Sequence, residues 1–173
     1  DQSPEEKIII APIIADVIQP LTVKANERKI KFNADIPSQL PAITADHAQF
    51  HQLMQNLCDN AIKYGEDGSK IKISVKLCDD IPLSTSYLVA SGPAVAISVN
   101  NRGAVIDSED INRLTERFYR MQVHKDKNIK GTGLGLAIAK HIIMRHHGNM
   151  KVTSSKRYGT TFTIYLPVEQ PKH

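Results

Sequence analysis

The sequence has 173 residues, 41% of them hydrophobic and 23% charged, which is enough for one domain with a sizeable core. A formal net charge of +4 falls short of the concentrated basic surface typical of nucleic-acid binders, and no apolar run reaches the roughly 18 to 20 residues of a membrane span. Two cysteines, Cys58 and Cys78, exclude a disulfide framework and fit a reducing compartment. Because the sequence starts at Asp1, we expect a piece of a longer protein.

The first third of the chain predicts a strand, a helix and a second strand. Residues 8–10 form a short β-branched run, and apolar residues at helical spacing follow. That helix buries one side (Ile13, Ile14, Val17, Ile18 and Leu21). Pro20 is expected to kink or weaken its far end. In residues 29–36, Ile30, Phe32 and Ala34 alternate with polar neighbours, as in a half-buried strand.

The longest helical pattern covers residues 48–64. Asp46 is a plausible N-cap, and Gly65 ends the pattern. Its apolar stripe consists of Phe50, Leu53, Leu57, Ala61 and Ile62. This periodicity predicts an amphipathic helix packed on a sheet.

The remainder predicts four strands and two helices. Strands are expected at 70–77 and 94–100, separated by a surface excursion, and at 150–155 and 160–167, joined by a turn at Tyr158 and Gly159. A short helix is expected within 107–121, a mobile polar loop at 122–130, and a helix from Leu134 to about His147. This order favours a mixed sheet with helices on one face and excludes a doubly wound parallel fold.

The stretch "NIKGTGLGLAIAKHI" (residues 128–142) is the first candidate site. Glycines at 131, 133 and 135 would let backbone N–H groups turn toward a ligand, and the helix start adds unpaired N–H groups. Lys127 and Lys130 would attract a polyphosphate. The alternative is a glycine-rich loop that packs on the sheet, and the spacing matches neither a dinucleotide fingerprint nor a P-loop.

Two further clusters of polar residues could bind a ligand. Asn56, Asn60 and Lys63 share one side of the predicted helix, where amide oxygens could complete a magnesium shell that also holds phosphates. The alternative is a solvated polar face. Asn101 and Gly103 follow a buried strand, a common position for ligand contacts, although a simple turn explains them equally well.

Taken together, these stretches resemble the catalytic and ATP-binding domain of bacterial sensor histidine kinases. "NLCDNAIKYG", "NNRGAVI", "ERFYR" and "GTGLGLAIAKHI" occur in the order of that family's N, G1, F and G2 boxes. The resemblance covers essentially the whole chain. It implies a single domain over residues 1–173 with the Bergerat fold, an α/β two-layer sandwich.

The resemblance also implies the ligands, Mg²⁺ and ATP, and the residues that hold them. Asn56 and Asn60 would coordinate Mg²⁺ and the phosphates, and together with Lys63 they would be the catalytic residues. The remaining nucleotide-binding residues would be Tyr64, Asn101, Gly103, Phe118, Gly131, Thr132, Gly133, Leu134, Gly135 and Thr161, with Thr160 as the alternative to Thr161. Within this set, Asn101 would sit where the adenine amino group is read, and Phe118 would anchor the ATP lid.

The G1 box departs from the family pattern Asp-x-Gly-x-Gly. Asn101 replaces the aspartate and Val105 the second glycine. An amide oxygen still accepts a hydrogen bond, but without charge assistance, at a cost on the order of 1 kcal/mol. Gln52, one turn before Asn56, cannot act as a base for hydrolysis, which fits transfer to a histidine.

The expected function is therefore transfer of the ATP γ-phosphate to a histidine on an upstream dimerisation domain, with a response regulator as partner. None of the seven histidines precedes an acidic residue as the family's acceptor does, and His146 and His147 are expected to face solvent or cap a helix weakly. No direct nucleic-acid contact is expected, and the domain would be cytoplasmic and reach a membrane only through other segments. The alternatives are a degenerate docking module without catalysis and an anti-sigma-type kinase.

Overall fold

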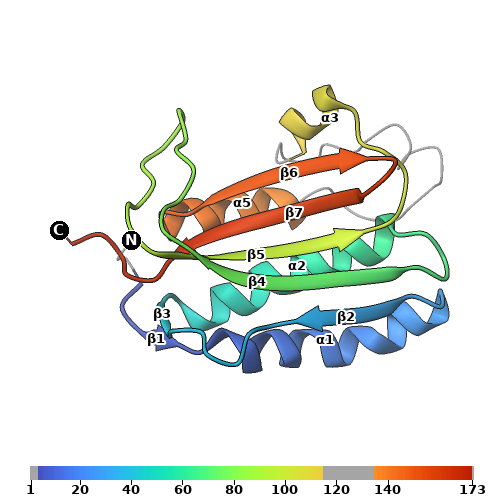
Figure 1. The fold of residues 1–173 in the computed structure, drawn as a ribbon, viewed down its shortest axis with the longest axis horizontal. Helices are drawn as coiled ribbons and strands as arrows, with labels where there is room; N and C mark the ends of the chain where they lie inside the picture. Colours follow the sequence, from blue (N-terminus) through green and yellow to red (C-terminus); the bar gives the residue numbers. More distant parts are fainter. Residues whose placement is uncertain (1–3, 115–134, 173) are drawn as a thin grey trace.

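The computed structural model describes residues 4–114 and 135–172, which form a sheet with helices packed on one face (Figure 1). The strands are β1 (Lys7–Ile8), β2 (Lys31–Asp35), β3 (Ile43–Thr44), β4 (Lys70–Cys78), β5 (Ala94–Asn101), β6 (Asn149–Ser155) and β7 (Gly159–Pro167). The helices are α1 (Ile10–Glu27), α2 (His47–Tyr64), α3 (Ser108–Arg113) and α5 (Gly135–Arg145). Figure 1 shows α1, α2 and α5 behind the sheet, which is the predicted two-layer arrangement.

The main sheet has five strands in the order β2-β4-β5-β7-β6. The β2–β4 pair is parallel and the other three pairs are antiparallel, so the sheet is mixed, as expected. A separate two-stranded sheet joins β1 to β3. It lies next to the C-terminal segment, because the Thr44 amide donates to the Val168 carbonyl.

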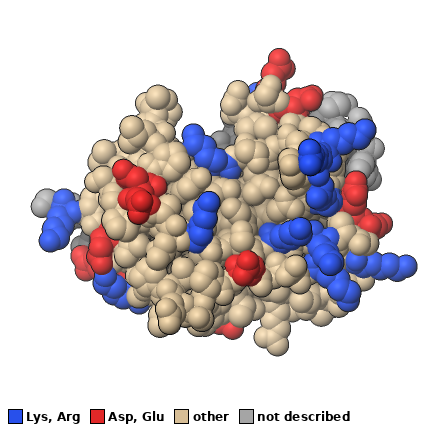
Figure 2. Space-filling view, viewed as in Figure 1, with Lys and Arg blue, Asp and Glu red and all other residues tan. Residues whose placement is uncertain are grey.

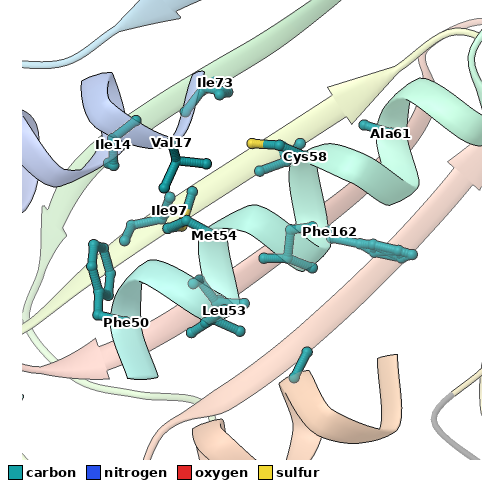
Figure 3. Packing of buried hydrophobic residues seen from close by; sticks show 14 of the residues in the cluster. Ile14, Val17, Phe50, Leu53, Met54, Cys58, Ala61, Ile73, Ile97 and Phe162 are labelled. Carbon is teal, nitrogen blue, oxygen red and sulfur yellow. The ribbon is translucent and has the colours of Figure 1, made fainter. Parts of the chain in front are cut away.

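The core lies between the helices and the inner face of the sheet, with α2 at its centre. Phe50, Leu53 and Leu57 of α2 are completely or almost completely buried, which confirms the predicted stripe. Figure 3 shows α2 side chains packing with residues from α1 and from β4, β5 and β7. The Asp46 side chain accepts a hydrogen bond from the Gln49 amide, 2.9 Å, and caps the helix as expected.

Strand alternation divides β5 and β7 into inner and outer residues. Ile97 faces the helices and is buried, whereas Ser98 bonds Thr163 on the outer face, with 2.9 Å between the hydroxyl oxygens. The same alternation puts Asn101 on the inner face and Asn100 on the outer one. Neighbouring residues of β5 therefore have opposite surroundings.

Two local expectations need correction. The first strand ends at Ile8, and α1 already begins at Ile10. Pro20, expected to kink or weaken the far end of this helix, lies inside α1, which continues to Glu27. Ala34 is exposed, because β2 is an edge strand that the helices only partly cover.

The expected surface excursion is present between β4 and β5. Residues 79–93 contain no helix or strand and project as a long loop beside α5 (Figure 1). The loop is attached to the body of the domain: the Asn149 amide donates to Pro82 O at 2.7 Å, and Lys140 Nζ donates to the Tyr87 hydroxyl at 3.2 Å. Among residues 4–114 and 135–172, no helix combines the length and apolar character that crossing a membrane requires.

Candidate functional site

The polar residues of the candidate site gather where β5 ends and β7 begins. Asn101 is directly opposite Thr160 in the antiparallel register, so both side chains lie on the inner face of the sheet. Thr161 pairs with Asn100 and accepts a hydrogen bond from its amide at 2.9 Å on the outer face. Thr160, rather than the expected Thr161, therefore shares a face with Asn101.

Asn101 is the most unusual residue at this end of the sheet. It is only 6% exposed, yet within residues 4–114 and 135–172 its side-chain amide makes no hydrogen bond. Buried amides in proteins are nearly always hydrogen-bonded, because an unpaired one costs about 1–3 kcal/mol. The Asn101 amide therefore has hydrogen-bonding capacity that the described part of the protein does not use.

Two glycines make room around Asn101. A Cβ on Gly103 would overlap the Tyr64 carbonyl oxygen and come within 3.3 Å of the Asn101 amide nitrogen. A Cβ on Gly159, which has a φ of +79°, would overlap the Asn101 carbonyl. Any larger residue at either position would push the turns away from Asn101.

A chain of hydroxyl groups fixes the loop that follows β5. The Ile106 amide donates to Ser154 Oγ at 2.9 Å, and Ser154 Oγ is 2.7 Å from Thr160 Oγ1. Because Ile106 is in the loop and Thr160 is opposite Asn101, Ser154 ties the loop to the site. Val105, the residue at the family's second glycine, is 46% exposed and takes no part in this chain.

Helix α2 supplies the other candidate ligands. Asn56 and Asn60, four residues apart, share one side of the helix and are half-buried. Asp59 lies on a different side, toward α1, because its carboxylate pairs with Lys24 at 2.7 Å. Lys63 is also near Asp59, 3.6 Å from the second carboxylate oxygen, so its ammonium group is available to a phosphate only by leaving or sharing that pair.

The end of α2 is fastened to the loop that carries Gly103. Gly65 and Gly103 form an isolated β-bridge, and the Glu66 amide donates to Arg102 O at 2.6 Å. Arg28 reaches the same end of the helix: its guanidinium donates to the carbonyl oxygens of Ile62 and Gly65. Four C-terminal carbonyls of a helix lack intrahelical partners, and Arg28 satisfies part of this set. Tyr64, the predicted nucleotide neighbour, is half-buried against the core here.

Helix α5 begins at Gly135, the last of the three predicted glycines. The other residues of this group, Phe118, Gly131, Thr132, Gly133 and Leu134, lie outside the described residues, as does the predicted loop at 122–130. The helix ends at Arg145, two residues before the expected boundary, and Gly148 begins the return to β6.

The expectation for His146 is wrong. Its side chain is buried, with 2% exposed, and joins two helices. The Asp46 backbone N–H donates to His146 Nε2 at 3.1 Å, and Nδ1 lies 2.8 Å from the Ile142 carbonyl. Only the neutral ring with its proton on Nδ1 satisfies both contacts. Burial, the largest cause, lowers the pKa of His146 from the usual 6.5, in keeping with this neutral form.

Positive charge accumulates near the same end of the sheet. Figure 2 shows Lys and Arg side chains gathered toward the right of the view, where β5 ends and β7 begins, together with some acidic ones. Arg102, Lys156 and Arg157 are exposed residues of this region. Figure 2 looks onto the strand face of the sheet, so the cations seen there lie on the face opposite to the one that Asn101 occupies.

Sequence reasoning missed four residues of this arrangement: Arg28, Ser154, Gly159 and His146. Gly159 was expected only as a turn residue, and its contact with Asn101 follows from strand register. A signal existed for Ser154, since strand alternation places it on the same face as Val152. Arg28 and His146 act on distant backbone groups, which no local pattern reveals.

Comparison with known proteins places this arrangement in a family. Residues 45–170 match the family of histidine kinase-, DNA gyrase B- and HSP90-like ATPases. The chain belongs to this family. Its two-layer α+β sandwich, with a mixed sheet covered on one face, is the fold of histidine kinase catalytic domains.

A curated relative is a sensor protein by its name. The heme sensor protein HssS of Staphylococcus aureus strain Newman is 36% identical over 163 residues, which cover 94% of this chain and 32% of that protein. The chain thus spans about a third of the length of the curated relatives it matches.

Solved structures have the same fold at lower identity. The mycobacterial sensor histidine kinase MprB superposes with a TM-score of 0.76 at 20% identity, covering 96% of this chain and 99% of that one. The catalytic domain of histidine kinase ThkA gives 0.74 at 24% identity, with 95% of each chain covered. Full-length ShkA, solved in complex with AMPPNP, gives 0.75 at 22% identity, covering this whole chain and 33% of that one.

Proposed function

We propose that this chain binds Mg–ATP and transfers its γ-phosphate to a histidine on a dimerisation domain of the same protein. Asn101 carries the proposal: a buried amide without a partner in the described protein, flanked by two glycines, is suited to read the edge of a nucleotide base. The family membership supports a nucleotide ligand.

In this proposal α2 supplies the groups that hold the metal and the phosphates. Asn56 and Asn60 lie on one side of the helix, and amide oxygens suit Mg²⁺, which takes few protein ligands and keeps phosphate oxygens and waters. Bound Mg²⁺ would neutralise charge on the transferring phosphoryl group. Lys63 exchanges its contact with Asp59 for a phosphate, and Thr160 borders the base beside Asn101.

The remaining assignments concern the whole protein. We infer that the chain is one catalytic and ATP-binding domain, with Phe118 and Gly131–Gly135 forming the lid and phosphate loop. The phosphate would pass from the histidine to a response regulator. The HssS relative, a heme sensor by its name, supports a role in signalling, and the domain would lie on the cytoplasmic side of a membrane-bound sensor.

Calorimetric titration with a non-hydrolysable ATP analogue tests the proposal. We expect micromolar binding that requires Mg²⁺, and Asn60→Ala should weaken the Mg²⁺-dependent part at least about tenfold, because an amide ligand is lost. Gln55→Ala, an exposed change on the same helix, is the matched control and should bind like the unchanged chain. Transfer of labelled γ-phosphate from ATP to the dimerisation domain would then test the reaction itself.

The rival function is a docking module that has lost nucleotide binding. Its prediction differs clearly: neither the unchanged chain nor Asn101→Asp would bind the analogue. If only Asn101→Asp bound, the pocket would be intact but disabled at one residue. That result would also contradict the proposed kinase.

A further inference from the structure

The chemistry of Asn101 differs from that of a carboxylate in one respect that affects base recognition. A carboxylate is only an acceptor, whereas an amide presents an acceptor oxygen and a donor nitrogen on one planar group. A half-turn about the terminal side-chain torsion exchanges the two. Asn101 can therefore meet either a donor or an acceptor in the same place.

Nothing in the described surroundings fixes the orientation of this amide. Asn101 makes no side-chain hydrogen bond within residues 4–114 and 135–172, and its neighbours Gly103 and Gly159 have no side chains. Only 6% of Asn101 is exposed, so few positions remain from which a partner can reach its amide.

The polar group opposite Asn101 is equally adaptable. Thr160 lies across the strand pair, where facing Cβ atoms are about 4.5–5.5 Å apart. Its hydroxyl is 2.7 Å from that of Ser154, and either oxygen can be the donor. When Ser154 donates, the Thr160 proton is directed outward; when Thr160 donates to Ser154, its oxygen accepts from the other side.

We propose that Asn101 can either accept a hydrogen bond from position 6 of a purine or donate one to it. The site would then bind 6-oxopurine nucleotides as well as adenine nucleotides. The inference rests on the proposed function, that Asn101 contacts the base. For a 6-amino group the amide oxygen accepts; for a 6-oxo group the amide nitrogen donates. Asn101 is thus a specificity-determining residue whose replacement by aspartate would restrict the site to 6-amino bases.

The test compares ADP with IDP, both with Mg²⁺, by titration calorimetry of the complete chain. IDP carries the 6-oxo group without the 2-amino group of guanine, so the comparison changes only how position 6 and its ring neighbour hydrogen-bond. We expect the two dissociation constants to differ by less than about tenfold. If the site could only accept or only donate a hydrogen bond at position 6, one of the two nucleotides would leave a buried group unpaired. Its dissociation constant would then be larger by on the order of tenfold to a hundredfold.

The variant Asn101→Asp supplies the second half of the test. The ratio of the IDP to the ADP dissociation constant should rise at least about tenfold, because a carboxylate repels the 6-oxo group. Asn33→Asp, which adds the same charge at an exposed position of β2, should leave the ratio unchanged. GDP, measured alongside, shows whether the 2-amino group is tolerated.

Two results would overturn the inference while leaving the proposed function intact. One is tight ADP binding by the unchanged chain with IDP tenfold or more weaker. The other is an IDP-to-ADP ratio that Asn101→Asp does not alter, which would mean that Asn101 is not the reader of position 6. Failure of the unchanged chain to bind either nucleotide would instead overturn the proposed function together with this inference.

Discussion

At the end of β5, the buried residue Asn101 lies next to Gly103, whose backbone closely approaches the Tyr64 carbonyl. The Gly103 Cα faces the Tyr64 carbonyl, and the Gly65–Gly103 bridge holds the two segments together. The space beside Asn101 therefore depends on the absence of a side chain at Gly103.

Gly103→Ala should weaken binding of the Mg²⁺-bound ATP analogue at least about tenfold. The added methyl group overlaps the Tyr64 carbonyl, so the loop must move and the bridge to Gly65 must open. Calorimetric titration measures the loss. Ala104→Ser, an exposed change one residue later, is the control and should bind normally; equal affinity for both variants would show that the close approach is unimportant.

At the residue scale, motifs in the sequence point to Asn101, Gly103, Asn56 and Asn60 as candidate site residues. The choice between Thr160 and Thr161 depends on which face each occupies, and the strand register settles that. The contacts of Ser154 and Arg28 join residues distant in the sequence, so spacing alone does not predict them.

At the level of elements, His146 connects the end of α5 to the start of α2. The Asp46 N–H is one of the donors that a helix start leaves without an intrahelical partner nearby, and His146 Nε2 accepts from it. The Asp46 side chain caps the same turn. The helix that begins at Gly135 is thereby fixed to the helix that carries Asn56 and Asn60.

The stability of the domain should fall as the pH is lowered below about 6.5. The unfolded chain takes up a proton on this imidazole near its usual pKa of 6.5, whereas burial keeps the folded pKa of His146 lower. Arg145 and His147 also lower this pKa, while the Ile142 carbonyl and Asp46 oppose them. The contribution is complete above pH 6.5 and is lost toward the folded pKa.

Urea denaturation at pH 7.5 and 5.5 measures this effect. His146→Gln keeps an acceptor but cannot titrate, so it should lose about 1–2 kcal/mol at pH 7.5 and show a smaller pH dependence. His141→Gln, at an exposed position of the same helix, should keep the full dependence. If the stability of His146→Gln kept the full pH dependence, that dependence would arise from groups other than His146.

Helix α1 shows why element boundaries are harder to predict than element types. Pro20 removes the hydrogen bond to the Asp16 carbonyl, but both residues are exposed, so water can replace it. Val17 and Ala25, before and after Pro20, are buried on the same core. This tertiary packing supports the helix beyond Pro20, where local propensity predicts a kinked or weakened end.

For the molecule as a whole, one covered face means that stability depends on a single layer of contacts. Ile97→Ala, in the central strand β5, should lower the free energy of unfolding by about 2–5 kcal/mol, because it leaves a cavity beneath α2. Ser74→Ala, on the exposed outer face of β4, should change it by less than about 0.5 kcal/mol. Urea denaturation of both variants checks the contrast, and equal losses would contradict it.

The type of sheet was predictable at this scale, but the strand order was not. Helices alternating with closely spaced strands indicate a mixed sheet covered on one face. The order β2-β4-β5-β7-β6 brings β5 next to β7, two strands separated by more than fifty residues of sequence. Such pairing depends on which inner faces fit together, and a periodic pattern in one strand does not specify its partner.

Asn100 and Asn101 are chemically identical neighbours with opposite surroundings. Asn100 holds the Tyr158 carbonyl and the Thr161 hydroxyl on the outer face, whereas Asn101 faces inward. Deleting one residue earlier in β5 would leave the composition of the site unchanged but present the other asparagine, and would turn the buried side chains of the strand toward water. The number of residues in β5 is therefore constrained more tightly than the identity of its outward-facing ones.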